Sequence, residues 1–125
     1  MILVDTSVWV DHLRRKSAPL SKLLEAGRVL VHPFVIGEVA LGHMRQRNLI
    51  LAALSNLPRT QVATEDEVLS FIERNALFGR GVGYIDVHLL AAAQLTPGAS
   101  LWTKDRKLHA VADALGLAVA EDRAS

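Results

Sequence analysis

Four carboxylates stand out in this chain because each lies beside segments that are otherwise apolar: Asp5, Glu38, Asp86 and Asp105. Carboxylates that meet at one place repel one another, so a cation is needed to neutralise them. An all-oxygen set of this kind suits Mg²⁺, with Mn²⁺ as a substitute. Such an ion can activate water and stabilise the charge of an in-line displacement at phosphorus. If the four side chains converge, the predicted chemistry is hydrolysis of a phosphodiester bond.

The segments that precede Asp5 and Asp105 predict how these two side chains are brought together. Residues 1–4 are all apolar and end abruptly at Asp5, which is typical of a strand buried on both faces. Asp105 follows a short apolar strand predicted over 99–102. In a parallel sheet the carboxyl ends of the strands share one edge, where α/β proteins keep their chemistry. We therefore expect both carboxylates at that edge.

The rest of the chain alternates between strand and helix patterns. Helical spacing of apolar residues predicts helices over 6–16, 19–27, 33–44, 48–57, 65–78, 84–95 and 107–115. Thr6 or Ser7 is expected to cap the first of these. A second strand is predicted over 28–32, with a weak edge strand at 61–63. The alternation predicts an α/β fold in which helices cover both faces of a mostly parallel sheet.

The two remaining carboxylates belong to predicted helices. Glu38 lies within the apolar run of the helix over 33–44, and Asp86 lies one turn from the start of the helix over 84–95. Both helices follow a strand or a loop break, so their amino ends can face the edge that carries Asp5 and Asp105. The four carboxylates can therefore meet without any unusual backbone.

Length and composition bound the fold and its surroundings. The 125 residues, half of them apolar, suit one domain over 1–125, with 121–125 as a frayed tail. Without cysteine the chain has no disulfide, thiolate metal site or cysteine nucleophile, which fits the cytoplasm. No apolar run approaches the roughly 20 residues of a membrane span, and no signal peptide is visible. With 14 Lys and Arg against 13 Asp and Glu, only a local basic patch could hold nucleic acid.

Four short motifs carry a resemblance to a known family: Asp5-Thr6-Ser7, Glu38 within residues 36–40, Asp86 before residues 89–91, and Thr103-Lys104-Asp105. In this order, in a chain of this length, they resemble the PIN-domain pattern, and most closely its VapC-type toxin branch. The match spans almost the whole chain, and its specificity comes from the four motifs together. His32 and Val87 depart from the pattern, because a small hydroxyl residue and an alanine are frequent at those places.

The resemblance implies a magnesium-dependent endoribonuclease with a three-layer α/β/α fold, which forms a homodimer and pairs with a cognate antitoxin that occupies the site. It assigns catalytic roles to all four carboxylates, Asp5, Glu38, Asp86 and Asp105, and metal contacts to Asp5, Asp86 and Asp105. It assigns supporting roles to the hydroxyl residues Thr6, Ser7 and Thr103. The apolar helix over 48–57 also suggests self-association, and Lys104 and Arg106 beside Asp105 can contact RNA phosphates.

Simpler interpretations exist for the single residues. Asp5 and Asp105 could each cap the helix that follows, and Asp86 could be a first-turn residue favoured by the helix dipole. The run Arg14-Arg15-Lys16 at the end of the first helix is expected to be solvated surface. Only the joint pattern of the carboxylates favours a functional site.

Two other classes of function stay open on the sequence. A phosphoacceptor receiver domain shares this length, alternation and set of strand-end carboxylates. A receiver domain would be expected to have two adjacent acidic residues after the first strand, whereas this chain has Asp5-Thr6 there. A catalytically idle binding module of the same fold would not need the carboxylates to converge.

Overall fold

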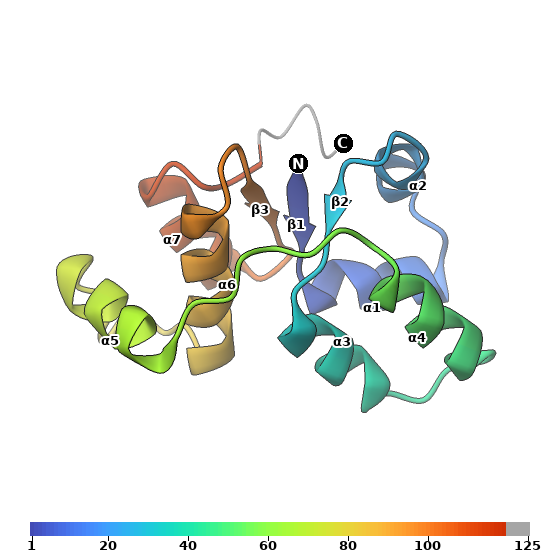
Figure 1. The fold of residues 1–125 in the computed structure, drawn as a ribbon, viewed down its shortest axis with the longest axis horizontal. Helices are drawn as coiled ribbons and strands as arrows, with labels where there is room; N and C mark the ends of the chain where they lie inside the picture. The colour runs from blue at the N-terminus through green and yellow to red at the C-terminus, as the bar shows by residue number, and fades with distance from the viewer. Residues whose placement is uncertain (120–125) are drawn as a thin grey trace.

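A parallel sheet stands at the centre of the molecule (Figure 1). The computed structural model describes residues 1–119, so the tail expected over 121–125 lies outside the described residues. Within them the strands β1 (Ile2–Val4), β2 (Val29–Leu30) and β3 (Ser100–Trp102) are arranged in the order β2-β1-β3. Ile2 is paired with Val29 on one side and with Ser100 on the other. The predicted strand at the start of the chain is therefore the central one, buried on both faces.

Single parallel bridges extend the sheet at both edges, from Val31 to Arg59 and from Leu101 to Ala118. The edge strand predicted over 61–63 is wrong. The chain instead pairs at Arg59, two residues before this range, with Val31, the residue that follows β2. The N–H of Val31 donates to the carbonyl of Pro58. The backbone N–H of Gln61 donates to the side chain of Thr96 instead of to a strand, so the pairing stops there.

Helices lie on both sides of the sheet, as the alternation predicts. They are α1 (Thr6–Arg14), α2 (Ala18–Glu25), α3 (Pro33–Ala40), α4 (Arg47–Ser55), α5 (Glu65–Arg74), α6 (Tyr84–Leu95) and α7 (Arg106–Ala114). In Figure 1, α1 to α4 gather on the side of β2, and α5 to α7 gather on the side of β3. The fold is thus the predicted α/β arrangement of helices, sheet and helices. None of the helices within residues 1–119 has the length and apolar character to cross a membrane.

Two helices end four residues earlier than their apolar spacing predicts. The helix predicted to reach residue 44 ends at Ala40, where the N–H of Gly42 turns to the carbonyl of Val39 and tightens the last turn. The helix predicted to reach residue 78 ends at Arg74, because Ala76 takes a left-handed conformation with φ 50°.

The helix α6 is the most buried of the helices in the described residues. Its bounds agree with the prediction, and all seven residues from Val87 to Ala93 are buried. Three successive alanines at 91–93 let neighbouring elements approach it closely. The first turn of α6, which carries Asp86, is therefore fixed by the core behind it.

The apolar helix α4 is mostly packed against the core. Leu54 is buried, and Ile50, Leu51 and Leu57 pack against the core cluster. Leu49 is the exception, with 67% of its surface exposed. The expected apolar surface for self-association is thus smaller than the sequence suggests.

Candidate functional site

Asp5 lies between the carboxyl end of the central strand β1 and the start of α1. Its backbone N–H donates to the carbonyl of Trp102 at 2.9 Å, which fixes the residue against the end of β3. Its side chain is 6% exposed and makes no capping bond to α1. Asp5 thus occupies the N-cap position of α1, where its carbonyl accepts from the N–H of Trp9 at 3.2 Å, but its carboxylate does not cap the helix.

The Asp5 carboxylate is held by two hydroxyl groups. Ser7 Oγ and Thr103 Oγ1 each donate to Asp5 Oδ2 at 2.7 Å. Both hydrogen bonds reach the same oxygen, so Asp5 Oδ1 accepts none from the residues that the structure describes. The carboxylate is oriented and keeps one oxygen for a ligand.

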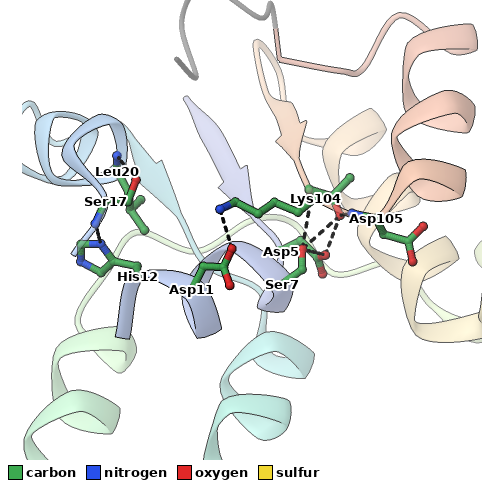
Figure 2. A network of polar contacts seen from close by, with 9 residues as sticks. Asp5, Ser7, Asp11, His12, Ser17, Leu20, Lys104 and Asp105 are labelled. Atoms are coloured by element: carbon green, nitrogen blue, oxygen red, sulfur yellow. Dashed lines mark hydrogen bonds and ion pairs between the residues drawn. The ribbon is translucent and has the colours of Figure 1, made fainter. Parts of the chain in front are cut away.

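The loop after β3 is tied into the same network (Figure 2). The N–H of Lys104 donates to Ser7 Oγ at 3.0 Å, and the N–H of Asp105 donates to Thr103 Oγ1 at 3.1 Å. Ser7 is therefore engaged with residues almost a hundred positions away and does not cap α1.

Glu38 is brought to α1 by the other predicted hydroxyl. Thr6 Oγ1 donates to Glu38 Oε1 at 2.7 Å, which joins the first turn of α1 to the last turn of α3. Thr6 is thus also unavailable as a cap. Glu38 is half-buried and lines a cleft of about 460 Å³ together with Arg14 and Met44.

Asp86 shows that the four carboxylates influence one another. Burial raises the pKa of its carboxyl group, and the negative charges of Asp5, Asp105 and Glu38 raise it further. The N–H of Gly83, which donates to Asp86 Oδ2 at 3.1 Å, opposes that pKa shift. Asp86 therefore occupies the first-turn position that its local pattern predicts and also lies within the field of the other three carboxylates.

Asp105 caps the last helix, as the simpler interpretation predicts. Its Oδ1 accepts from the N–H of Leu108 at 3.0 Å, and the residue is exposed. It lines a cleft of about 730 Å³ with Arg106 and His109. Its charge still reaches Asp86, so capping does not remove Asp105 from the carboxylate set.

The oxygen atoms of the four carboxylates are suitable ligands for a hard cation, but their positions in the structure do not form a closed metal site. Within residues 1–119, no three carboxylate or imidazole groups lie close enough to hold a metal ion. Carboxylate oxygens are the ligands that Mg²⁺ and Mn²⁺ prefer. Burial raises the pKa of Asp86, and the neighbouring negative charges, which a cation would neutralise, raise it further.

His32, which departs from the family pattern, has a structural role. It is fully buried, and its Nδ1 accepts from the N–H of Phe34 at 2.9 Å, which caps α3. Burial, together with the positive charges of His88 and Arg59, lowers the pKa of His32 to about 4. In the sequence, Pro33 indicates that His32 is the N-cap residue, because proline favours the first position of a helix.

Comparison with known proteins finds a family and curated sequences that this chain resembles. The family described as "PIN domain" matches residues 2–114. The chain is similar to "Ribonuclease VapC32" of Mycobacterium tuberculosis, in the strains CDC 1551 / Oshkosh and ATCC 25618 / H37Rv. In both comparisons the sequences are 48% identical over 122 residues, and the match covers 98% of each protein.

Proposed function

This chain belongs to the PIN-domain family, and from that premise we propose that it is a VapC-type toxin, a metal-dependent endoribonuclease that hydrolyses RNA phosphodiester bonds. The observation that supports the proposal is the negative charge that three other carboxylates exert on Asp86, together with the hydroxyl groups that orient Asp5 and Glu38. Asp5, Glu38 and Asp105 all raise the pKa of Asp86, although they lie on different elements. A binding module with no reaction to perform would have no need of this mutual repulsion.

The proposed site uses Asp5, Asp86 and Asp105 to hold Mg²⁺, for which Mn²⁺ can substitute. When bound, the ion lowers the pKa of a coordinated water and neutralises charge on the phosphate. Ser7 and Thr103 orient Asp5 through Oδ2, so that Oδ1 stays directed to a ligand. Thr6 orients Glu38, whose charge completes the acidic edge.

The phosphoacceptor alternative loses its physical support. A receiver site needs a lysine ammonium beside its acceptor carboxylate, whereas the side chain of Lys104 extends to Asp11, where Nζ pairs with Oδ2 at 2.6 Å. Asp5 is also hydrogen-bonded to two hydroxyls.

We further propose a cognate antitoxin as partner, a cytoplasmic location and a homodimer. The cysteine-free composition supports a reducing compartment. Leu41 and Leu49, exposed to 89% and 67%, support an apolar contact near the ends of α3 and α4. A sedimentation mass of one chain at micromolar concentrations would contradict the dimer.

The direct test is cleavage of total cellular RNA, with mapping of the ends produced. We expect Asp5→Asn to lower magnesium-dependent cleavage by about 100-fold or more, because one ligand charge is lost. Glu25→Gln is the matched control, since Glu25 is an exposed carboxylate at the end of α2, and it should cleave like wild type. Full cleavage by folded Asp5→Asn protein would refute the mechanism.

A further inference from the structure

A basic hollow lies beside the carboxylate site, at the carboxyl end of α1. It has a volume of about 470 Å³ and is lined by Asp11, Arg14, Arg15, Lys16, Ser17 and Lys104. Four of these side chains are cationic and one is anionic. The chain as a whole has a formal charge of only +1, so this hollow concentrates positive charge that the composition does not reveal.

Lys104 connects this hollow to the carboxylate site. Its backbone N–H donates to Ser7 Oγ at 3.0 Å, and Ser7 in turn donates to Asp5. Its side chain extends in the opposite direction and pairs with Asp11 Oδ2 at 2.6 Å. Figure 2 shows Lys104 reaching from the Asp5–Ser7 contact to Asp11. A strand with one phosphate at Asp5 would therefore meet this hollow immediately outside the bond to be cut.

The backbone that forms the rim of the hollow is held at several points. The N–H of Arg15 donates to the carbonyl of Asp11 at 2.8 Å. The N–H of Ser17 donates to His12 Nδ1 at 2.9 Å, while Ser17 Oγ accepts from the N–H of Leu20 as the cap of α2 (Figure 2). Arg14 is thus the last residue of α1, and Arg15 and Lys16 stand on a short connection that is anchored at both ends.

The cations at the rim of the hollow form no ion pairs with carboxylates in the described part of the chain, apart from Lys104. Cations at the end of a helix are favoured by its dipole, which alone would explain one or two of them. Within residues 1–119, however, the only carboxylate paired with a cation of the hollow is Asp11, and it pairs with Lys104. Arg14, Arg15 and Lys16 are exposed and form no ion pair with a carboxylate among the described residues, although the charge of Arg14 acts on Asp11. Guanidinium groups in this state suit phosphate oxygens, which they contact with two parallel hydrogen bonds.

We propose that the hollow binds the phosphate backbone of the RNA strand whose scissile bond lies at Asp5, and that a phosphate replaces Asp11 as the partner of Lys104. This inference rests on the proposed ribonuclease function and adds the path of the substrate. Because phosphates carry no base identity, the hollow positions the strand and does not select its sequence.

The test measures the binding of a short single-stranded RNA of mixed sequence to full-length Asp5→Asn protein, with chelator present, over a series of salt concentrations. The slope of log affinity against log salt changes by about 0.7 for each phosphate contact on a single strand. We expect Arg14→Ala/Arg15→Ala, in the same background, to reduce the steepness by about 1.4. Arg28→Ala/Arg74→Ala is the matched control, since it removes two exposed arginines that do not line the hollow.

A separate arm tests the role of Asp11. Asp11→Asn removes the competing charge beside Lys104, so RNA should bind about threefold more tightly at low salt. Equal losses in the two double variants would overturn the hollow as the binding site, and weaker binding by Asp11→Asn would overturn the exchange of partners.

The same proteins separate this inference from the proposed function. If wild type cuts RNA but the two double variants bind RNA equally, the hollow is wrong and the nuclease stands. If wild type cuts no RNA but only the Arg14→Ala/Arg15→Ala slope falls, the hollow stands and the nuclease is wrong.

Discussion

At the scale of single residues, the site contains one carboxylate that hydrogen bonds orient, Asp5, and one that other negative charges repel, Asp86. Asp5 is oriented by two hydroxyl donors. Asp86 is placed where burial and three other carboxylates raise its pKa. That repulsion costs stability in the absence of a cation and provides the affinity for one when it binds.

His32 provides a prediction about pH. Its pKa is lowered from 6.5 to about 4 in the folded protein, so between these values the unfolded chain binds more protons than the folded one. Stability is therefore expected to fall as the pH falls from about 6.5 toward about 4. His32→Asn keeps an oxygen that can cap α3 and removes the titration. We expect it to abolish roughly 1–2 kcal/mol of the loss between pH 7 and pH 4.5.

The measurement is chemical denaturation at both pH values. His43→Asn is the control, because it makes the same substitution at an exposed histidine outside the core. An equal pH dependence in wild type and His32→Asn would show that His32 is not the group that titrates.

At the scale of the elements, the site depends on how the ends of β1 and β3 are joined. Thr103 bonds the Asp5 carboxylate and receives the N–H of Asp105, so one side chain ties the central strand to the start of α7. The strands themselves are only two or three residues long. Side-chain contacts beyond their ends therefore decide where the carboxylates lie.

Replacing Thr103 by valine tests this joint. Thr103→Val keeps the shape but leaves a buried carboxylate with one donor fewer, which should lower the free energy of unfolding by about 1–3 kcal/mol. Cleavage should fall by about 10- to 100-fold, as expected for loss of a group that orients a ligand.

Thr60→Val is the matched control for that change. Thr60 and Thr103 are both 6% exposed, but Thr60 Oγ1 has no hydrogen-bond partner in the part of the chain that the structure describes. Its removal should leave stability unchanged or raised, with cleavage unaffected. Equal destabilisation by the two valines would mean that the Thr103 hydrogen bonds contribute nothing specific.

At the scale of the whole molecule, opposite charges are separated over a nearly neutral chain. The acidic edge includes Asp5 and Asp86, and the basic hollow at the end of α1 adjoins it through Lys104. In the proposed ribonuclease, the hollow would attract RNA while a bound metal ion neutralised the acidic edge.

The same acidic edge predicts how the proposed antitoxin inhibits the enzyme. An arginine suits this edge because its planar fork pairs with carboxylates and keeps its charge when desolvated. Since it would compete with Mg²⁺, a tenfold excess of the ion over its dissociation constant should weaken inhibition about tenfold. Inhibition that ignored both the metal and an arginine-to-alanine change in the antitoxin would indicate a remote contact.

The sequence by itself determined the local elements and the order of the carboxylates. The apolar run before Asp5 predicts the central strand, and apolar periodicity predicts α6 with its observed bounds, because both signals depend on neighbouring residues. The capping position of Asp105 follows in the same way from its place before a helix. Where a left-handed residue ends a helix early, as at Ala76, local periodicity failed.

Only the tertiary structure decided which distant side chains meet. Ser7 and Thr103 are 96 residues apart, and Lys104 and Asp11 are 93 apart. A spacing rule cannot predict such contacts, because they depend on the path of every intervening loop and on the packing of the helices around the sheet. For this reason the hydroxyls expected to cap α1 hold carboxylates instead, and the basic run Arg14-Arg15-Lys16, expected to be plain surface, lines a hollow beside the site.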